Sequence, residues 1–296
     1  MIPYEKQETL LSVRNLNLSF KLGEIGDIGR DGKRIEKEED TIKVILSNIN
    51  FDVNNIITPG NGTRGQVESI VGPSGAGKSM LIKALANLNT HGNLTGDILV
   101  YNKENILRPV KGGDMGLVFQ NYYIPEHMRI ERMLRKAAKK NKDFKGDKKL
   151  IKDAVDSYLV EFDLMEHKNK FPLELSGGQN QRACIMMQLL NGSYFILLDE
   201  PFSGLDPLMI DKTTALLQKI ANSDEKKTLI IISHDLENCC AISDTVHVLS
   251  KKGRADNTGS TIVDTIDLLE RDLAYHPEIK RMPGFHNVID EIKNYL

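Results

Sequence analysis

A glycine-rich turn between an expected strand and an expected helix constrains the fold of this chain most strongly. The turn reads GPSGAGKS from Gly72 to Ser79; it follows the expected strand QVESIV and precedes KSMLIKALANL, which is apolar at helical spacing. Small residues in such a turn let successive backbone N–H groups point inward, and the positive N-terminal end of the helix adds to them. The pattern G-x-x-x-x-G-K-[ST] therefore predicts a cradle for nucleotide phosphates rather than a flexible glycine turn.

Within this cradle the residue types suggest separate roles. We expect Lys78 to reach the β- and γ-phosphates and the Ser79 hydroxyl to ligate Mg²⁺. The residues expected to bind the nucleotide are Gly72, Pro73, Ser74, Gly75, Ala76, Gly77, Lys78, Ser79 and Met80.

Two carboxylates follow a second apolar strand, FILLDE, at residues 195–200. For an isolated Asp-Glu pair, helix capping or a surface position would be the favoured interpretation. After a buried strand in a chain with a phosphate cradle, the pair predicts that Asp199 binds magnesium, directly or through water. Glu200 is then expected to polarise the attacking water.

A second anion-binding turn occurs upstream of that strand, in LSGGQNQR at residues 175–182. A serine and two glycines at a helix start again present backbone N–H groups to an anion. Because one nucleotide needs only one cradle, the second one suggests a site for another subunit's nucleotide.

With these motifs in this order, the chain resembles the ATP-binding-cassette (ABC) ATPases over residues 10–252. GPSGAGKS matches the Walker A loop, LSGGQ the signature motif and FILLDE the Walker B strand of that family. Shorter matches are Phe119-Gln120 with the Q-loop, SGLD at residues 203–206 with the D-loop, His234 in ISHD with the switch histidine, and Phe20 with the aromatic residue that stacks on adenine. If each residue is considered without the other motifs, the favoured interpretation of Gln120 is a surface amide, that of His234 a helix cap or core residue, and that of Phe20 a core residue.

The resemblance implies a head-to-tail dimer that holds two ATP molecules and closes on ATP binding. Residues Ser176, Gly177, Gly178 and Gln179 would contact the partner's nucleotide, and Asp206 would couple the two sites. The implied catalytic residues are Glu200, His234, Gln120 and Lys78, and the implied Mg²⁺ ligands are Ser79, Gln120 and Asp199.

The implied fold is an α/β P-loop core of the ABC ATPase type with a mostly parallel sheet, an antiparallel β subdomain and a helical signature subdomain. The short apolar segments YFILLDE and TLIIISH fit strands buried on both faces. We expect one ABC domain comprising residues 10–125 (β subdomain and Walker A), 126–190 (helical subdomain), 191–252 (Walker B and switch) and a C-terminal extension, 253–296. Residues 21–41 and the segment ITPGNGTRG, 57–65, are expected to be exposed loops.

Bulk properties exclude several classes of function. The formal net charge of −2 gives no global argument for nucleic acid, and the three cysteines lack metal-type spacing and indicate reduced thiols. No signal peptide and no apolar run near the roughly 18 residues of a membrane span are present, so a membrane role would need a partner. The basic run 135–149 is interpreted first as a solvated face, with anionic lipid and then nucleic acid as alternatives.

Two departures from the family pattern stand out. Met80 replaces the usual threonine, and the lost hydroxyl predicts weaker nucleotide binding by roughly 1 kcal/mol. The helix after the signature reads CIMMQLL over 184–190, which indicates altered packing rather than lost activity.

The favoured function is the ATP-hydrolysing subunit of an ABC transporter, importer-type, at the inner face of the cell membrane. Its expected partners are a second copy or a paralogous ATPase subunit, separate permease subunits and a solute-binding protein. The alternative is a soluble ABC ATPase acting on nucleic acid, ribosomes or Fe–S assembly; a single cassette and no long heptad run argue against it. A regulatory module without turnover is a third class, and Glu200 argues against that one.

Overall fold

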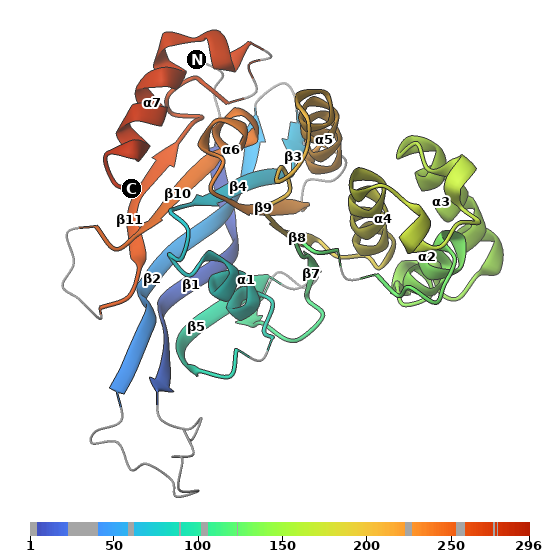
Figure 1. Cartoon of the computed structure of the whole chain (residues 1–296), viewed down its shortest axis with the longest axis horizontal. Coiled ribbons are helices and arrows are strands. Elements are labelled where there is room, and N and C mark those ends of the chain that lie inside the picture. The colour runs from blue at the N-terminus through green and yellow to red at the C-terminus, as the bar shows by residue number, and fades with distance from the viewer. Residues whose placement is uncertain are drawn as a thin grey trace, which may run out of the picture.

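Two β-sheets and a group of helices beside them make up the chain (Figure 1). The computed structural model describes residues 5–22, 41–58, 62–88, 90–101, 106–122, 124–222, 227–252, 258–274, 276 and 278–296. Residues 23–40, most of the expected 21–41 loop, therefore lie outside the described part.

A six-stranded sheet forms the centre of the molecule in the order β11-β10-β4-β9-β8-β7. Five strands are parallel, and β11 at the edge pairs antiparallel with β10. The strands are β4 (Gln66–Val71), β7 (Met115–Val118), β8 (Phe195–Asp199), β9 (Thr228–Ser233), β10 (Thr245–Ser250) and β11 (Thr261–Asp267). Every residue of β4, β9 and β10 is buried, as expected for parallel strands covered on both faces. The predicted mostly parallel core is confirmed.

The second sheet is antiparallel, with the order β3-β2-β1-β5-β6. Its strands are β1 (Glu5–Leu22), β2 (Thr41–Thr58), β3 (Gly62–Arg64), β5 (Asn93–Tyr101) and β6 (Leu107–Pro109). The prediction of a loop at residues 57–65 was wrong for residues 57–58 and 62–64, because β2 continues to Thr58 and pairs with β3. Pairing to a neighbouring strand satisfies the backbone there despite the glycine- and asparagine-rich composition.

The first helix, α1 (Lys78–Leu85), lies between the two sheets. Its fully buried Leu81, Ile82 and Leu85 share one hydrophobic cluster with residues of β1, β2 and the central sheet. Backbone hydrogen bonds from Ser260 to Ile45 and from Ser47 to Ser260, each 2.9 Å, also join β2 to the segment before β11. The residues that open α1 are therefore held between two sheets.

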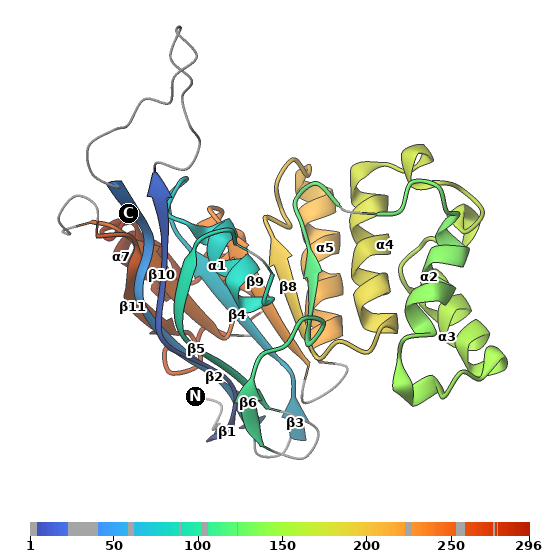
Figure 2. The same cartoon turned by 90° about the horizontal axis from the view of Figure 1, so that it is seen from below.

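Three helices form a layer beyond the β7 edge of the central sheet (Figure 2). They are α2 (Ile130–Ala138), α3 (Lys148–Glu161) and α4 (Gly177–Leu190), joined by the short 3₁₀ turns Lys142–Phe144, Met165–His167 and Pro172–Glu174. This layer confirms the predicted helical subdomain. The remaining helices are α5 (Pro207–Ala221), α6 (Leu236–Ile242) and α7 (Pro283–Lys293), with a 3₁₀ turn at Ile279–Arg281.

The C-terminal part of the chain joins the core. Residues 261–267, inside the expected 253–296 extension, form β11 of the central sheet. Among the helices that the structure describes, none has the length and apolar character to cross a membrane. All three cysteines are free and buried, and burial raises the pKa of the Cys184 and Cys240 thiols to about 12.

Candidate functional site

The glycine-rich turn lies where parallel strand β4 ends and α1 begins. An added Cβ at Gly72 would lie 2.3 Å from the carbonyl oxygen of Leu249 in β10. Gly77 has a φ of +93°, and its added Cβ would lie 2.9 Å from Ile45 of β2. Close backbone approach and left-handed geometry thus explain why small residues are needed here.

Lys78 reaches back over the turn. Its ammonium group donates to the carbonyl oxygens of Gly72 at 2.8 Å and Pro73 at 3.1 Å, and the residue is only 8% exposed. Burial lowers the pKa of Lys78, while the charges of Glu200 and Asp199 act in the opposite direction. A phosphate entering the turn would compete with two carbonyl oxygens for this cation.

Asp199 ends β8 beside the first turn of α1. The Ser79 hydroxyl lies 3.5 Å from its carboxylate oxygen Oδ1. Burial raises the pKa of Asp199 most, the Glu200 charge adds to that rise, and Ser79 and Lys78 counteract it. A hydroxyl and a carboxylate are hard oxygen ligands of the kind that Mg²⁺ prefers beside phosphate, so the pair fits this metal.

Glu200 is held by a network on β9. Its backbone is left-handed, with a φ of 52°, and its N–H donates to the carbonyl oxygen of Ile232 at 2.8 Å. The side chain accepts a 2.6 Å hydrogen bond from Ser233, and its other oxygen lies 2.9 Å from Nδ1 of His234. A non-glycine residue in this conformation is uncommon and costs about 1–3 kcal/mol, so the surrounding contacts must hold it there.

The structure thus brings Lys78, Ser79, Asp199, Glu200 and His234 to one edge of the central sheet. That edge is formed by the carboxyl ends of the parallel strands β4, β8 and β9, where α/β proteins commonly bind ligands. Ser233 was not among the predicted site residues, although a hydroxyl directly before the histidine in ISHD was an available signal.

Gln120 follows the carboxyl end of β7 and is exposed. Its amide donates to the Ser203 hydroxyl at 3.3 Å, a contact that joins the expected Q-loop to the SGLD segment. Asp206 ends that segment as the N-cap of α5 and accepts from Met209 N–H at 3.1 Å. Ser203 is a second contact residue that the sequence did not single out.

Phe20 and Met80 are partly buried and pack against the cluster between the two sheets. An added Cβ at Gly92 would lie 3.0 Å from the Phe20 ring, so the absence of a side chain at Gly92 leaves space for the ring. Stacking of Phe20 on adenine stays a prediction.

The signature residues begin α4. The hydroxyl of Ser176 accepts from Gln179 N–H at 3.3 Å, and the Gln179 side-chain oxygen accepts from Ser176 N–H at 2.9 Å, which together make a capping box. Gly177 is exposed, with no atom within 4 Å of an added Cβ, whereas Gly178 would meet Met209 of α5 at 2.9 Å.

The signature residues are not joined to the chain's own phosphate turn. Among the described residues, no hydrogen bond or ion pair links residues 176–179 to residues 72–80. Helices α1 and α4 lie apart in both views (Figures 1 and 2). The two anion-binding turns therefore belong to different parts of the fold.

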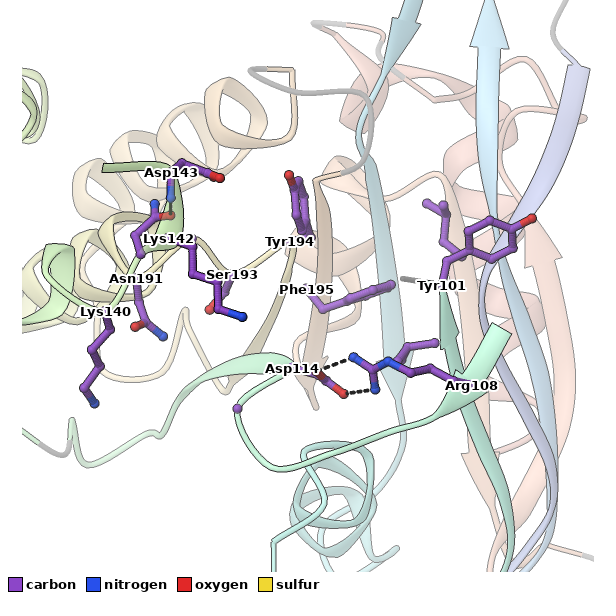
Figure 3. A pocket seen from close by; sticks show the side chains of 15 residues that line it. Tyr101, Arg108, Asp114, Lys140, Lys142, Asp143, Asn191, Ser193, Tyr194 and Phe195 are labelled. Carbon is purple, nitrogen blue, oxygen red and sulfur yellow. Dashed lines mark hydrogen bonds and ion pairs between the residues drawn. The ribbon is translucent and has the colours of Figure 1, made fainter. Parts of the chain in front are cut away.

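A cleft of about 720 Å³ lies at the opposite edge of the central sheet (Figure 3). It borders the amino ends of β7 and β8, where Asp114 accepts two 2.7 Å hydrogen bonds from the Arg108 guanidinium. Lys140 and Lys142 of the basic run line its other side, and both are exposed. This cleft is separate from the phosphate turn.

Known proteins of similar sequence include import ATP-binding proteins. Residues 60–203 match the sequence model described as ABC transporter. The chain is 31% identical over 220 residues to an aliphatic sulfonates import ATP-binding protein of Bacillus cereus, across 74% of this chain and 79% of that protein. It is 30% identical over 220 residues to an Fe(3+) ions import ATP-binding protein of Fusobacterium nucleatum, across 73% of this chain and 54% of that protein. The match therefore spans about half the length of the Fusobacterium relative.

Solved structures share the fold. A subunit of an ABC transporter complex from Clostridium perfringens has a TM-score of 0.63 and 22% identity, across 96% of this chain and 100% of that chain. A dimeric ATP-binding cassette in a post-hydrolysis state, bound to ADP and phosphate, has a TM-score of 0.62 and 21% identity, across 88% and 99% of the two chains. At these identities the likeness concerns the fold.

Proposed function

Because this chain belongs to the ABC transporter family of ATP-binding proteins, we propose that it is the ATP-hydrolysing subunit of an importer-type ABC transporter. The observation that carries this proposal is the position of Glu200. Contacts to Ser233 and His234 hold its carboxylate at the sheet edge that also carries Lys78 and Asp199. A chain that only bound nucleotide would need the phosphate turn but not a fixed carboxylate beside it.

The residues take these roles in the proposal. Lys78 leaves the carbonyl oxygens of the turn and binds the β- and γ-phosphates. Glu200 orients and polarises the attacking water, and His234, paired with Glu200, contacts the γ-phosphate. Ser79, Asp199 and Gln120 would hold Mg²⁺, which when bound neutralises charge on the phosphate oxygens.

We further propose that the α4 N-terminus completes the nucleotide site of a second subunit. In an α-helix the first N–H groups have no partner within the helix. In α4 the side chain of Ser176 satisfies Gln179 N–H, and the first-turn N–H groups of Gly177 and Gly178 remain for an anion. The dimeric state of the similar cassette, and the separation of α4 from this chain's own turn, both support a site shared between two copies.

The proposed role in transport is based on the names of the similar proteins. Their names give different cargoes, aliphatic sulfonates and Fe(3+) ions, so the cargo is expected to be chosen outside this chain. Separate permease subunits, together with a solute-binding protein, would supply that choice, with this subunit at the inner membrane face. The import names favour this function over a non-transport ATPase acting on nucleic acid or ribosomes.

The substitution Ser176→Arg tests the shared site. It places a bulky cation at the open end of α4, so turnover should be lost while one chain still binds ATP with its own turn. Loss of the cap should lower stability by about 1 kcal/mol. Val160→Arg, at an exposed position of α3, is the matched control and should keep full turnover. Undiminished hydrolysis by Ser176→Arg would contradict the shared site.

A further inference from the structure

We propose that His167 is a positioning residue for the signature helix, acting through Gln179. Its ring nitrogen Nε2 lies 2.9 Å from the side-chain nitrogen Nε2 of Gln179. Gln179 in turn closes the capping box on Ser176. The inference rests on the proposed function, in which this end of α4 receives the partner's nucleotide.

The hydrogen-bond chemistry permits only one arrangement of these groups. The backbone N–H of Ser176 can only donate, so the Gln179 atom that faces it at 2.9 Å must be the carbonyl oxygen Oε1. The amide NH₂ of Gln179 therefore faces His167, and because NH₂ can only donate, Nε2 of His167 must accept. The ring is then neutral, with its proton on Nδ1.

Nδ1 of His167 is buried and has no hydrogen-bond partner within the described residues. A buried donor without a partner costs free energy, so this ring position is not the most favourable one for stability alone. Such departures from local optimisation are expected where a side chain serves a site. What the ring does supply is a single acceptor directed at the Gln179 amide.

Hydrogen bonds hold the backbone on both sides of His167. Its N–H donates to Leu164 at 2.9 Å, and its carbonyl oxygen accepts from Lys170 N–H at 2.9 Å. The carbonyl oxygens of Lys168 and Lys170 then accept from the first residues of α2, Glu131 and Ile130, at 2.9 and 3.0 Å. A side chain on a segment held in this way can fix the orientation of a neighbouring amide.

The fixed amide determines which donors remain free at the end of α4. With Gln179 oriented by His167, the Ser176 N–H is satisfied internally and the Ser176 oxygen accepts from Gln179 N–H. The hydroxyl proton of Ser176 and the N–H groups of Gly177 and Gly178 are left for the partner's γ-phosphate. If the amide rotates, its NH₂ faces Ser176 N–H, and the cap opens where the charge must be bound.

Three substitutions of His167 test this role. The His167→Gln variant places a carbonyl oxygen about as far from the backbone as Nε2 of the native ring. The His167→Asn variant carries the same amide on a side chain one methylene shorter, and the His167→Leu variant has no hydrogen-bond acceptor. ATP turnover, ATP affinity of the single chain and the thermal midpoint are measured for each variant, with Ser176→Arg in parallel. We expect His167→Leu and His167→Asn to lose roughly fivefold in kcat, the effect of about one hydrogen bond, with unchanged ATP affinity of the single chain. His167→Gln should remain within twofold of the wild type.

The outcomes separate this inference from the proposed function. If His167→Leu turns over ATP as fast as the wild type while Ser176→Arg is inactive, His167 has no positioning role and the shared site stands. Equal losses in the Gln and Leu variants would also overturn the inference, because the acceptor would then not matter. Full turnover in Ser176→Arg would refute the shared site itself.

Discussion

Replacing Glu200 by glutamine removes the charge of this side chain and keeps its shape. The amide oxygen of the Glu200→Gln variant can accept from Ser233, whose hydroxyl lies 2.6 Å from the native carboxylate. The new NH₂ can donate to Nδ1 of His234, now 2.9 Å from the carboxylate. These two contacts survive as neutral hydrogen bonds. The backbone N–H of His234, which lies 3.2 Å from Oε1 and 3.4 Å from Oε2 of Glu200, can still donate to the remaining amide oxygen, so the local geometry should be preserved.

The two consequences of this substitution differ greatly in size. A hydrogen bond to a charged group contributes about 1.5–3 kcal/mol and a neutral one about 0.5–1.5 kcal/mol. Since His234 is 60% exposed, its contact is screened, and the unfolding free energy should fall by only about 1 kcal/mol. Loss of a general base slows a reaction by about 10²–10⁴-fold, or roughly 3–5 kcal/mol of barrier.

The assay follows phosphate release at saturating ATP, with urea unfolding and sedimentation of the same samples. We expect hydrolysis at 1% of wild type or less, a slightly lower urea midpoint, retained ATP binding and accumulation of a dimer with ATP. Glu237→Gln, the same change at an exposed position of α6, is the control and should behave as the wild type.

Two results would refute this reasoning. Full turnover in Glu200→Gln would show that the carboxylate is not the base. A loss of several kcal/mol in unfolding free energy would instead show that the charge of Glu200 mainly stabilises the fold.

Four further substitutions probe the phosphate turn and its neighbours. Because burial raises the pKa of Asp199, the native chain binds the carboxyl proton of Asp199 more tightly than the unfolded chain does, and the unfolding free energy should fall as pH rises from about 3.8 through the pKa of the native chain. Asp199→Asn should remove that fall. The thermal midpoint of the variant should therefore exceed that of the wild type at pH 7 but not at pH 3. Met80→Thr should tighten ATP binding by roughly 1 kcal/mol in nucleotide titrations, and unchanged affinity would count against the hydroxyl. Gly72→Ala should lower the unfolding free energy, measured in urea, by about 3 kcal/mol, because the new Cβ would lie 2.3 Å from a backbone oxygen. Gly75→Ala should lower it by only about 1 kcal/mol, because Gly75 has a φ of +80° but no atom within 4 Å of an added Cβ.

The parts of the fold that could be predicted from sequence are those with local causes. The apolar residues 195–198 of β8 and 229–232 of β9 indicate strands buried on both faces, and the small residues between Val71 and Lys78 indicate the turn. Order along the chain then places Asp199 and Glu200 at the carboxyl end of a parallel strand. Each of these features depends on neighbours within a few residues.

The remaining features depend on contacts between distant residues. The strand pairing of residues 62–64 depends on β2, and the composition of that segment indicated a loop. The contacts of Gln120 with Ser203 and of Gln179 with His167 form only when segments distant in sequence pack together. Such contacts have no periodic signal in a single sequence.

The order of the central sheet has a consequence for the growing chain on the ribosome. The central strand β4 ends at Val71, yet its two neighbours begin at Thr228 and Thr245. At 5–20 residues per second, synthesis takes roughly 8–30 seconds to proceed from β4 to β9, and during that time both edges of β4, whose residues are all buried in the folded chain, lack their native partners. We therefore expect nascent chains that end before β9 to be aggregation-prone. We also expect them to be unable to retain nucleotide, because β4, the strand that leads into the phosphate turn, is not yet paired with β9 and β10.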